Sequence, residues 1–143
     1  METTTATTTT PDVDIDRLSA GFHRCFETFE AADGLFADDA FFDLLPPLWR
    51  FQLVGGTAFT QQLRAIAEGP VRVEVVRTIP TATGFVTEHV EHMDVDGAAM
   101  VARRLWLCGV RDGRIVDVTG YCNGGWDDEL RARHAAEAPM LRA

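Results

Sequence analysis

Three ionisable side chains that could perform acid–base chemistry lie in one strand-like part of the chain: His89, Glu91 and Arg104. Histidine has an ordinary pKa near neutral pH, and a nearby carboxylate can hold its tautomer and support the imidazolium. An arginine facing them could hold an anionic group or an enolate oxygen through its fork of charged donors. We predict His89 as base or acid, Glu91 as orienter or second carboxylate, and Arg104 as anion holder.

Other chemistry is less well supported by the residue types, and one structural alternative stays open. His89, Glu91 and Arg104 could instead form a buried charge cluster that satisfies itself. We favour a site, because inward charges in an apolar cavity more often mark function. Cys108 lacks a sequence arrangement that would activate its thiol. His89 and His92 would point to opposite faces of a strand, so we predict neither a metal nor a cofactor.

The three side chains belong to an apparent antiparallel meander over residues 85–121. Runs rich in β-branched and aromatic residues cover 85–93, 100–110 and 115–121, and an Asp-Gly pair separates each run from the next. Asp-Gly between such runs is typical of a β-hairpin. Because side chains alternate along a strand, the loop lengths decide which residues share a face.

The first turn, at Asp96-Gly97, allows two arrangements. A two-residue loop turns His89 and Glu91 inward, and a three-residue loop turns Glu88 and His92 inward instead. Periodicity does not separate them, since both faces are half polar. We choose the two-residue loop, which Asp-Gly favours.

At the second turn, the apolar pattern favours a three-residue loop over residues 111–113, with Gly113 in the bulge position. That choice makes the inner row the apolar one, as a core-facing row should be. The residues that would share this face are Arg104, Trp106, Cys108, Val116, Val118 and Gly120.

Helices and strands in the first half must position this meander. The spacing predicts a helix carrying Ile15, Leu18, Phe22 and Phe29, interrupted at Asp33-Gly34. The expected order then continues with a turn at 38–39, a strand over 41–45, a bend at Pro46-Pro47, extended chain over 49–54, a helix with Phe59, Leu63 and Ile66 that closes at Gly69-Pro70, and a strand over 71–75. Helices followed by antiparallel strands indicate an α+β fold, with the helices on one face of a curved sheet and a cavity between them.

Composition excludes several classes of function. The 143-residue chain has a formal net charge of -9, and all 13 of its basic Lys or Arg residues are arginine. An acidic chain without a basic stripe argues against nucleic acid and anionic membrane surfaces as partners. Three cysteines without paired spacing indicate reduced thiols, so we expect a cytoplasmic protein. We expect a disordered Thr-rich tail over 1–11 without a signal peptide, one domain over 12–126, and a polar, partly helical tail over 127–143.

The chain resembles the nuclear transport factor two-like superfamily in three successive features. These are the run Leu35-Phe-Ala-Asp-Asp-Ala40 before a strand, a helix that begins with glycine, and a meander that contains Asp-Gly-Arg-Ile115. The resemblance covers roughly residues 12–126 and is to the branch with SnoaL-like polyketide cyclases, ketosteroid isomerases and limonene epoxide hydrolases. It implies a cone-shaped, mixed or antiparallel sheet wrapped around N-terminal helices, a cystatin-like α+β barrel. It also implies a small hydrophobic substrate, in polyketide or other secondary metabolism.

When the catalytic residues of the family are transferred to this sequence one by one, the best-known catalytic groups have no counterpart here. The ketosteroid isomerase base falls on Leu44, beside Asp43, and its oxyanion-hole acid falls on Trp106. The water-holding positions of the epoxide hydrolases fall on Phe42, Leu44 and Gly120. Their Arg and Asp pair on the third strand falls on His89 and Glu91, which agrees with the face chosen from the turn.

We therefore predict a cofactor-independent isomerase, cyclase, dehydratase or hydrolase, or alternatively a non-catalytic binding or scaffold domain. The substrate-binding residues predicted to line an apolar pocket are Phe22, Phe42, Leu44, Trp49, Trp106, Cys108 and Val118. On the outer face, Leu105, Leu107 and Tyr121 form an apolar row that a monomer would expose. We predict that this row forms a homodimer interface.

Overall fold

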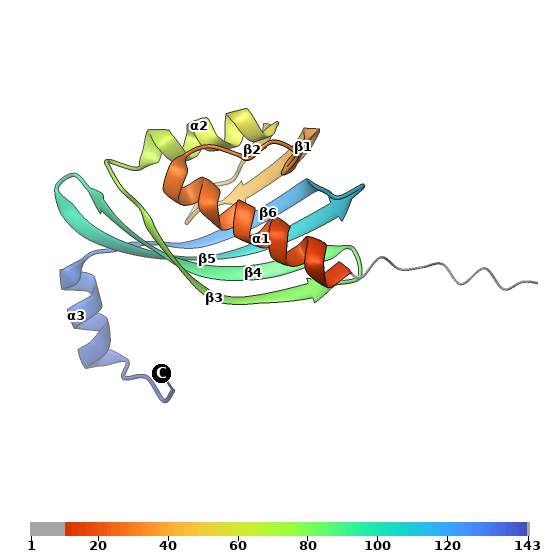
Figure 1. Ribbon diagram of the computed structural model, residues 1–143. Helices are drawn as coiled ribbons and strands as arrows, with labels where there is room; N and C mark the ends of the chain where they lie inside the picture. The colour runs from red at the N-terminus through yellow and green to blue at the C-terminus, as the bar shows by residue number, and fades with distance from the viewer. Residues whose placement is uncertain (1–10, 143) are drawn as a thin grey trace, which may run out of the picture.

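The apolar residues at helical spacing near the start of the chain form α1 (Pro11–Thr28), which lies across the sheet in Figure 1. The structure is a computed structural model that describes residues 11–142. At the end of α1, Phe29 takes a left-handed φ of 58°, and its amide donates to the carbonyl of Cys25 at 2.8 Å. The helix therefore ends before Asp33-Gly34, where the sequence had predicted the interruption.

The remaining elements follow the order expected along the chain: a strand, a second extended segment, a helix, a strand, the meander and a C-terminal helix. Their bounds are β1 (Phe36–Leu45), β2 (Phe51–Val54), α2 (Gly56–Ile66), β3 (Arg72–Thr81), β4 (Gly84–Val95), β5 (Ala98–Arg111), β6 (Arg114–Trp126) and α3 (Asp128–Glu137). The predicted tail over 1–11 lies outside the described residues except for Pro11, which begins α1.

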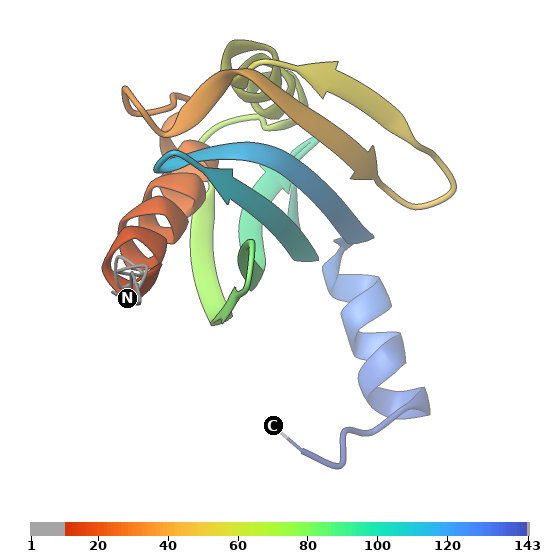
Figure 2. The same ribbon diagram turned by 90° about the vertical axis from the view of Figure 1, so that its right-hand side faces the viewer.

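Six strands form one mixed sheet in the order β2-β1-β6-β5-β4-β3. The β1–β6 pair is parallel and the other pairs are antiparallel. The sheet curves around α1 and α2, as the two views in Figures 1 and 2 show, without closing into a barrel. This is the predicted α+β cone, with the core between the two helices and the inner face of the sheet.

The Asp96-Gly97 turn has the predicted two-residue loop. Val95 pairs with Ala98, and both turn residues have positive φ, 51° and 78°, as a type I′ turn requires. His89 consequently lies opposite Arg104 in the β4–β5 ladder. The prediction that decides which charges face inward is confirmed.

The three-residue loop predicted at the second turn is wrong, although most of the face assignment survives. Arg111 pairs with Arg114, so the loop is again the two-residue Asp112-Gly113. The ladder then shifts, because Gly109 pairs with Asp117 while Val110 pairs with Ile115, leaving Val116 as an extra residue. This bulge restores the predicted inner row beyond it, with Trp106 opposite Gly120 and Cys108 opposite Val118.

Because of this bulge, one residue predicted to face inward does not do so. Val116 was predicted to face the core, but Ile115 is the fully buried residue there and Val116 is only half-buried. A periodicity of two cannot place a residue beyond an irregularity that the sequence does not mark.

Three boundaries in the first half also differ from prediction. Residues 38–39 are not a turn, because β1 already begins at Phe36 and its ladder with β6 is irregular between Phe36 and Phe41. The extended chain after Pro46-Pro47 is regular only over β2, and α2 ends at Ile66, ahead of Gly69-Pro70.

α3 projects from the end of β6, away from the other two helices, in both Figure 1 and Figure 2. Asp127 caps its first turn by accepting a hydrogen bond from the Leu130 amide at 2.8 Å. Trp126 and His134 make a ring contact between β6 and α3, with centroids 5.0 Å apart. None of its residues is buried, so it adds little to the core.

The outer sheet face does expose the predicted apolar row, since Leu105, Leu107 and Tyr121 are all exposed. The homodimer through this face stays a prediction. Within residues 11–142, no helix has the length and apolar character needed to cross a membrane.

Candidate functional site

A cavity of about 250 Å³ opens where the ends of β1 and β6 meet α2 and the middle of β5. Its lining residues are Leu44, Leu45, Pro46, Pro47, Phe51, Phe59, Gln62, Leu63, Ile66, Arg104, Trp106, Gly120, Tyr121, Cys122, Gly124 and Gly125. Arg104 is the one charged side chain in this lining, as far as the described part of the chain goes. Sites for drug-sized ligands measure roughly 300–1,000 Å³, so this cavity suits a smaller, mostly apolar molecule.

Trp106 forms the inner wall of the cavity because Gly120 leaves room for its ring. A Cβ atom on Gly120 would lie 2.2 Å from Cζ3 of Trp106, well inside van der Waals contact. The neighbouring strand therefore needs glycine at this position to let the indole lie flat against it.

We expect Gly120→Ala to destabilise the fold by about 1–3 kcal/mol, the usual cost of overpacking a filled core. The indole would be forced out of its position, so its near-ultraviolet circular dichroism should change as well. Urea denaturation measures the first effect. Gly125→Ala is the suitable control, because an added Cβ at that position makes only ordinary van der Waals contacts. Gly113→Ala is not suitable, because Gly113 has a positive φ of 73° that alanine would strain. Equal stability of the two variants would contradict the prediction.

Arg104 reaches the cavity wall while a buried carboxylate holds it from behind. Its Nε donates to Oε2 of Glu91, whose side chain is only 3% exposed against 16% for Arg104. Burial raises the pKa of Glu91 above its ordinary value, and Arg104 acts in the opposite direction. The guanidinium also lies 5.9 Å from the centroid of the Trp106 ring, within cation–π range.

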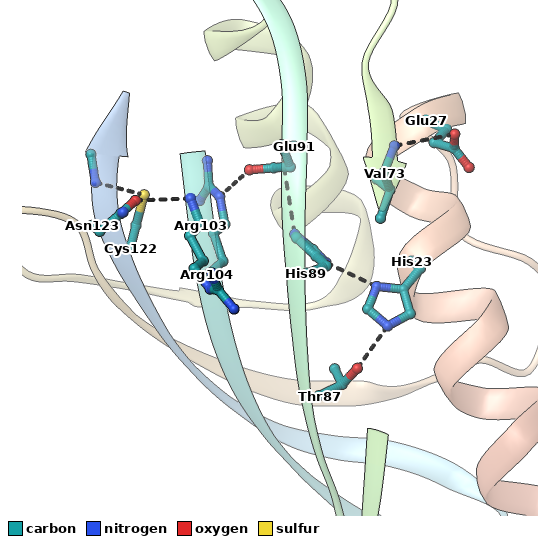
Figure 3. A network of polar contacts seen from close by, with 11 residues as sticks. His23, Glu27, Val73, Thr87, His89, Glu91, Arg103, Arg104, Cys122 and Asn123 are labelled. Atoms are coloured by element: carbon teal, nitrogen blue, oxygen red, sulfur yellow. Dashed lines mark hydrogen bonds and ion pairs between the residues drawn. The ribbon is translucent and has the colours of Figure 1, made fainter. Parts of the chain in front are cut away.

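His89 continues the polar chain inward from Glu91, as Figure 3 shows. It has no exposed surface, and its Nδ1 lies 2.9 Å from Nδ1 of His23. Its other nitrogen, Nε2, lies 3.9 Å from Oε1 of Glu91 and has no hydrogen-bond partner. Burial lowers the pKa of His89 to about 2, with smaller contributions from His23 and Arg104, so the ring is neutral.

His23, on α1, belongs to the site although the sequence analysis did not select it. Its Nε2 lies 2.8 Å from the hydroxyl of Thr87, and burial lowers its pKa to about 4. A signal existed in the sequence: His23 lies between Phe22 and Phe26 on the apolar stripe, four residues after Ser19, which is also buried. A histidine inside such a stripe must find a polar partner across the core.

The opposite faces of the same strands carry a second, exposed set of charges. Glu88 pairs with Arg103 at 2.8 Å and with Arg77 at 3.2 Å, and His92 lies 3.2 Å from Glu74. Glu88 and His92 are therefore the outward counterparts of Glu91 and His89. They provide matched controls for any test of the inner set.

The predicted substrate-binding residues divide into three groups. Leu44 and Trp106 line the cavity, as predicted for them. Phe22, Phe42 and Val118 are fully buried but lie in the core instead, since Phe59 stacks on both phenyl rings and separates them from the cavity. The prediction that these three form its wall does not match the lining.

Trp49 and Cys108 also lie outside the lining. Trp49 is 71% exposed, because the chain turns after Pro46-Pro47 and the Trp49 amide donates back to the Pro46 carbonyl at 3.2 Å. Cys108 is buried against β4 and β6 beneath a separate depression. Burial raises the pKa of its thiol, which makes it a poor nucleophile.

His89 faces inward as predicted, but it does not reach the cavity. The imidazole packs against the rings of Phe26 and Trp106, with centroids 4.7 Å and 6.1 Å away, and of these two rings Trp106 lines the cavity. Arg104 is thus the member of the predicted triad that a ligand would touch, with Glu91 and His89 behind it. Across residues 11–142, no three His, Cys, Asp or Glu side chains are grouped so that they could hold a metal ion.

Comparison with solved structures places this geometry among known folds. An epoxide hydrolase of M. tuberculosis described as LEH-like aligns over 90% of this chain and 98% of its own, with a TM-score of 0.61 and 18% identity. The fold is NTF2-like. IdmH of Streptomyces antibioticus, a candidate polyketide cyclase, also has this fold: it aligns over 76% of this chain and 91% of its own, with a TM-score of 0.59 and 20% identity.

A further solved structure with this fold carries no stated activity. A hypothetical protein of Catenulispora acidiphila with a ketosteroid isomerase-like fold, bound to trimethylamine, aligns over 73% of this chain and 83% of its own, with a TM-score of 0.57 and 15% identity. The sequence matches no family model and no curated protein. The neighbours therefore establish the fold, and the reaction must be argued from the residues of the site.

Proposed function

We propose that this protein binds a small, mostly apolar molecule bearing one anionic or strongly polarised oxygen, and transforms it by acid–base chemistry without a cofactor. The observation that carries the proposal is the position of Arg104: a single guanidinium on the wall of a largely apolar cavity, fixed by the carboxylate of a buried glutamate. Few polar groups at defined positions in an apolar pocket are what orient a small ligand.

Arg104 would supply the electrophilic half of the chemistry. Its Nε is occupied by Glu91, which leaves the terminal nitrogens for the oxygen of a ligand. A guanidinium in a pocket shielded from water stabilises negative charge that develops on that oxygen, as on an enolate. An isomerisation, cyclisation or dehydration that passes through such an anion fits this site.

The proton would be received by Glu91, whose carboxylate lies directly behind the Arg104 guanidinium. His89, which stays neutral, lies on the inner side of this carboxylate, with Nε2 3.9 Å from Oε1. Burial keeps the Glu91 pKa above its ordinary value, which favours proton uptake once a ligand anion shares the guanidinium.

Binding without catalysis is the second candidate, and one observation favours it. His89 has no exposed surface and does not line the cavity, so the protein could hold a ligand through Arg104 alone. The two candidates share the ligand class and differ only in proton transfer.

A carboxylate probe tests the shared part of the proposal. We expect 2-naphthoate to bind more tightly than 2-naphthamide in isothermal titration calorimetry, and Arg104→Met to weaken naphthoate at least about tenfold, the loss of one charge-assisted contact. Arg103→Met, on the outer face, is the matched control and should bind like the unmodified protein. Arg104→Lys keeps the charge and should retain most of the naphthoate affinity. Equal affinity for the two probes, or unchanged naphthoate affinity in Arg104→Met, would contradict the ligand class.

Proton exchange separates the two candidates. We expect the protein to accelerate exchange of the α-hydrogens of 2-tetralone with D2O, followed by NMR, and Glu91→Gln to reduce the acceleration by about a hundredfold or more. Glu88→Gln is the control and should exchange normally. Exchange at the buffer rate in the presence of a protein that binds naphthoate would favour the non-catalytic candidate.

A further inference from the structure

One polar side chain interrupts the apolar face that α2 turns toward the cavity. The residues of α2 that line the cavity lie at the spacing of one helix face: Phe59, Gln62, Leu63 and Ile66. Phe59 and Leu63 are buried, as a core-facing side of a helix should be. Gln62 brings a carboxamide into this otherwise apolar wall, and a carboxamide that is shielded from water needs hydrogen-bond partners.

The fold does not supply such a partner for Gln62. Thr60, which is also polar and buried on α2, is satisfied within the helix, since its hydroxyl donates to the Thr57 carbonyl at 3.1 Å. Among residues 11–142, no side chain or backbone group makes a hydrogen bond with the carboxamide of Gln62. Its donor and acceptor therefore remain for solvent or for a molecule in the cavity.

Gln62 and Arg104 lie on different walls of the same cavity. Arg104 comes from β5, whereas Gln62 comes from α2, one of the two helices inside the curve of the sheet (Figures 1 and 2). Leu63, the next residue of α2, lines both the cavity and a small crevice beside Arg104 and Glu91, so the two walls approach each other there. A cavity of about 250 Å³ is small enough for one ligand to reach both walls.

The other cavity residues with polar side-chain atoms belong to the wall of Arg104. Cys122 lies directly opposite Arg104 in the β5–β6 ladder, and Tyr121, its neighbour in β6, is half exposed. Neither places a polar group on the wall that α2 forms. Within the described part of the chain, Gln62 is thus the polar side chain of that wall.

We infer that Gln62 is a specificity-determining residue, which binds an uncharged hydroxyl or carbonyl group of the ligand while Arg104 binds its anionic oxygen. A carboxamide suits such a group because it both donates and accepts. It carries no charge, so a second charged group on the ligand would be desolvated there without compensation. The ligand class is thereby narrowed to small, mostly apolar molecules with two oxygen functions. The inference rests on the proposed function for the anionic end of the ligand and adds the other end.

Isothermal titration calorimetry with hydroxylated probes tests this inference. The probes are 2-naphthoate and the isomers of it that carry one hydroxyl group on the second ring. We expect at least one isomer to bind about three- to tenfold more tightly than 2-naphthoate, the gain from one well-placed hydrogen bond. Gln62→Leu should abolish this gain without weakening 2-naphthoate itself. Gln61→Leu is the matched control, because Gln61 is exposed on the same helix, and it should keep the gain.

Two results would overturn the inference: no isomer binds more tightly than 2-naphthoate, or the gain survives in Gln62→Leu. Gln62→Met, which is unbranched like glutamine, makes the same comparison should the leucine variant fold poorly. If Arg104→Met weakens 2-naphthoate as expected but the hydroxyl gain is absent, the proposed function stands and the role of Gln62 fails.

Neutral probes test Gln62 even if the anionic ligand class is wrong. In that case 2-naphthoate and 2-naphthamide bind equally, and the hydroxyl comparison is made with 2-naphthamide and its ring-hydroxylated isomers. A gain that Gln62→Leu abolishes and Gln61→Leu keeps would support recognition by Gln62 while the proposed role of Arg104 fails. No gain with the amides, or no binding of any probe, would overturn the inference.

Discussion

Between pH 7.5 and pH 5, the free energy of unfolding is expected to fall by roughly 3–4 kcal/mol because two buried histidines stay neutral in the folded protein. Burial lowers the pKa of His23 to about 4 and that of His89 to about 2, whereas both titrate near 6.5 in the unfolded chain. A lowered pKa gives stability that is present above pH 6.5 and is lost as the pH falls. Each histidine contributes about 1.36 kcal/mol per pH unit below that value.

The pKa of Glu91 shifts in the opposite direction, so Glu91 offsets part of the expected loss of folding free energy. Its pKa is raised by burial, so protonation favours the folded state as the pH falls through the carboxylate range. Urea denaturation at pH 7.5, 6 and 5 measures the net effect. His23→Gln should remove about half of the dependence, and His92→Gln, on the outer face, should remove none. A His23→Gln protein with the original pH dependence would contradict the assignment.

Replacing Arg104 by Met is expected to cost about 3–5 kcal/mol of folding free energy at pH 7, since it leaves a buried carboxylate without its counter-charge. Removing both charges, in Arg104→Met with Glu91→Leu, should restore most of this loss because neither charge then needs compensation. The single variant should recover as the pH falls, when Glu91 takes up a proton.

The outer ion pair is the matched comparison for this double-mutant cycle. Arg103→Met and Glu88→Leu act on an exposed pair of the same chemistry on the same strands, so each should cost no more than about 1 kcal/mol. Urea denaturation of the two single variants and the double variant on each face, six proteins in all, gives both coupling energies. Similar coupling on the two faces would show that the inner pair is not shielded from water.

The sequence predicted the cone and the inward face of β4 because both depend on local signals. Asp96-Gly97 specifies a type I′ turn by its chemistry, and that turn fixes His89 opposite Arg104. The apolar spacing of α1 predicted its buried face in the same way, with Leu18 and Phe22 in the core.

What could not be predicted depends on contacts between distant segments. The bulge at Val116 arises where β6 must pair with both β5 and β1, and nothing near Val116 in the sequence marks it. The link between His23 and His89 spans 66 residues and requires the curvature of the sheet. Phe59 separates Phe42 from the cavity only because α2 packs over β1 at that point.

The presence of similar charges on both faces of β4 and β5 has a consequence for how the chain finds its alignment. Sliding one strand past the other by a single residue would still bring acids near arginines, so electrostatic attraction cannot by itself reject the wrong alignment. The Asp96-Gly97 turn can, because its two-residue loop pairs Val95 with Ala98 and leaves no slack for a shift between the two strands. The accuracy with which this hairpin assembles thus depends on its uncharged connection, and the ionic contacts on both faces follow from it.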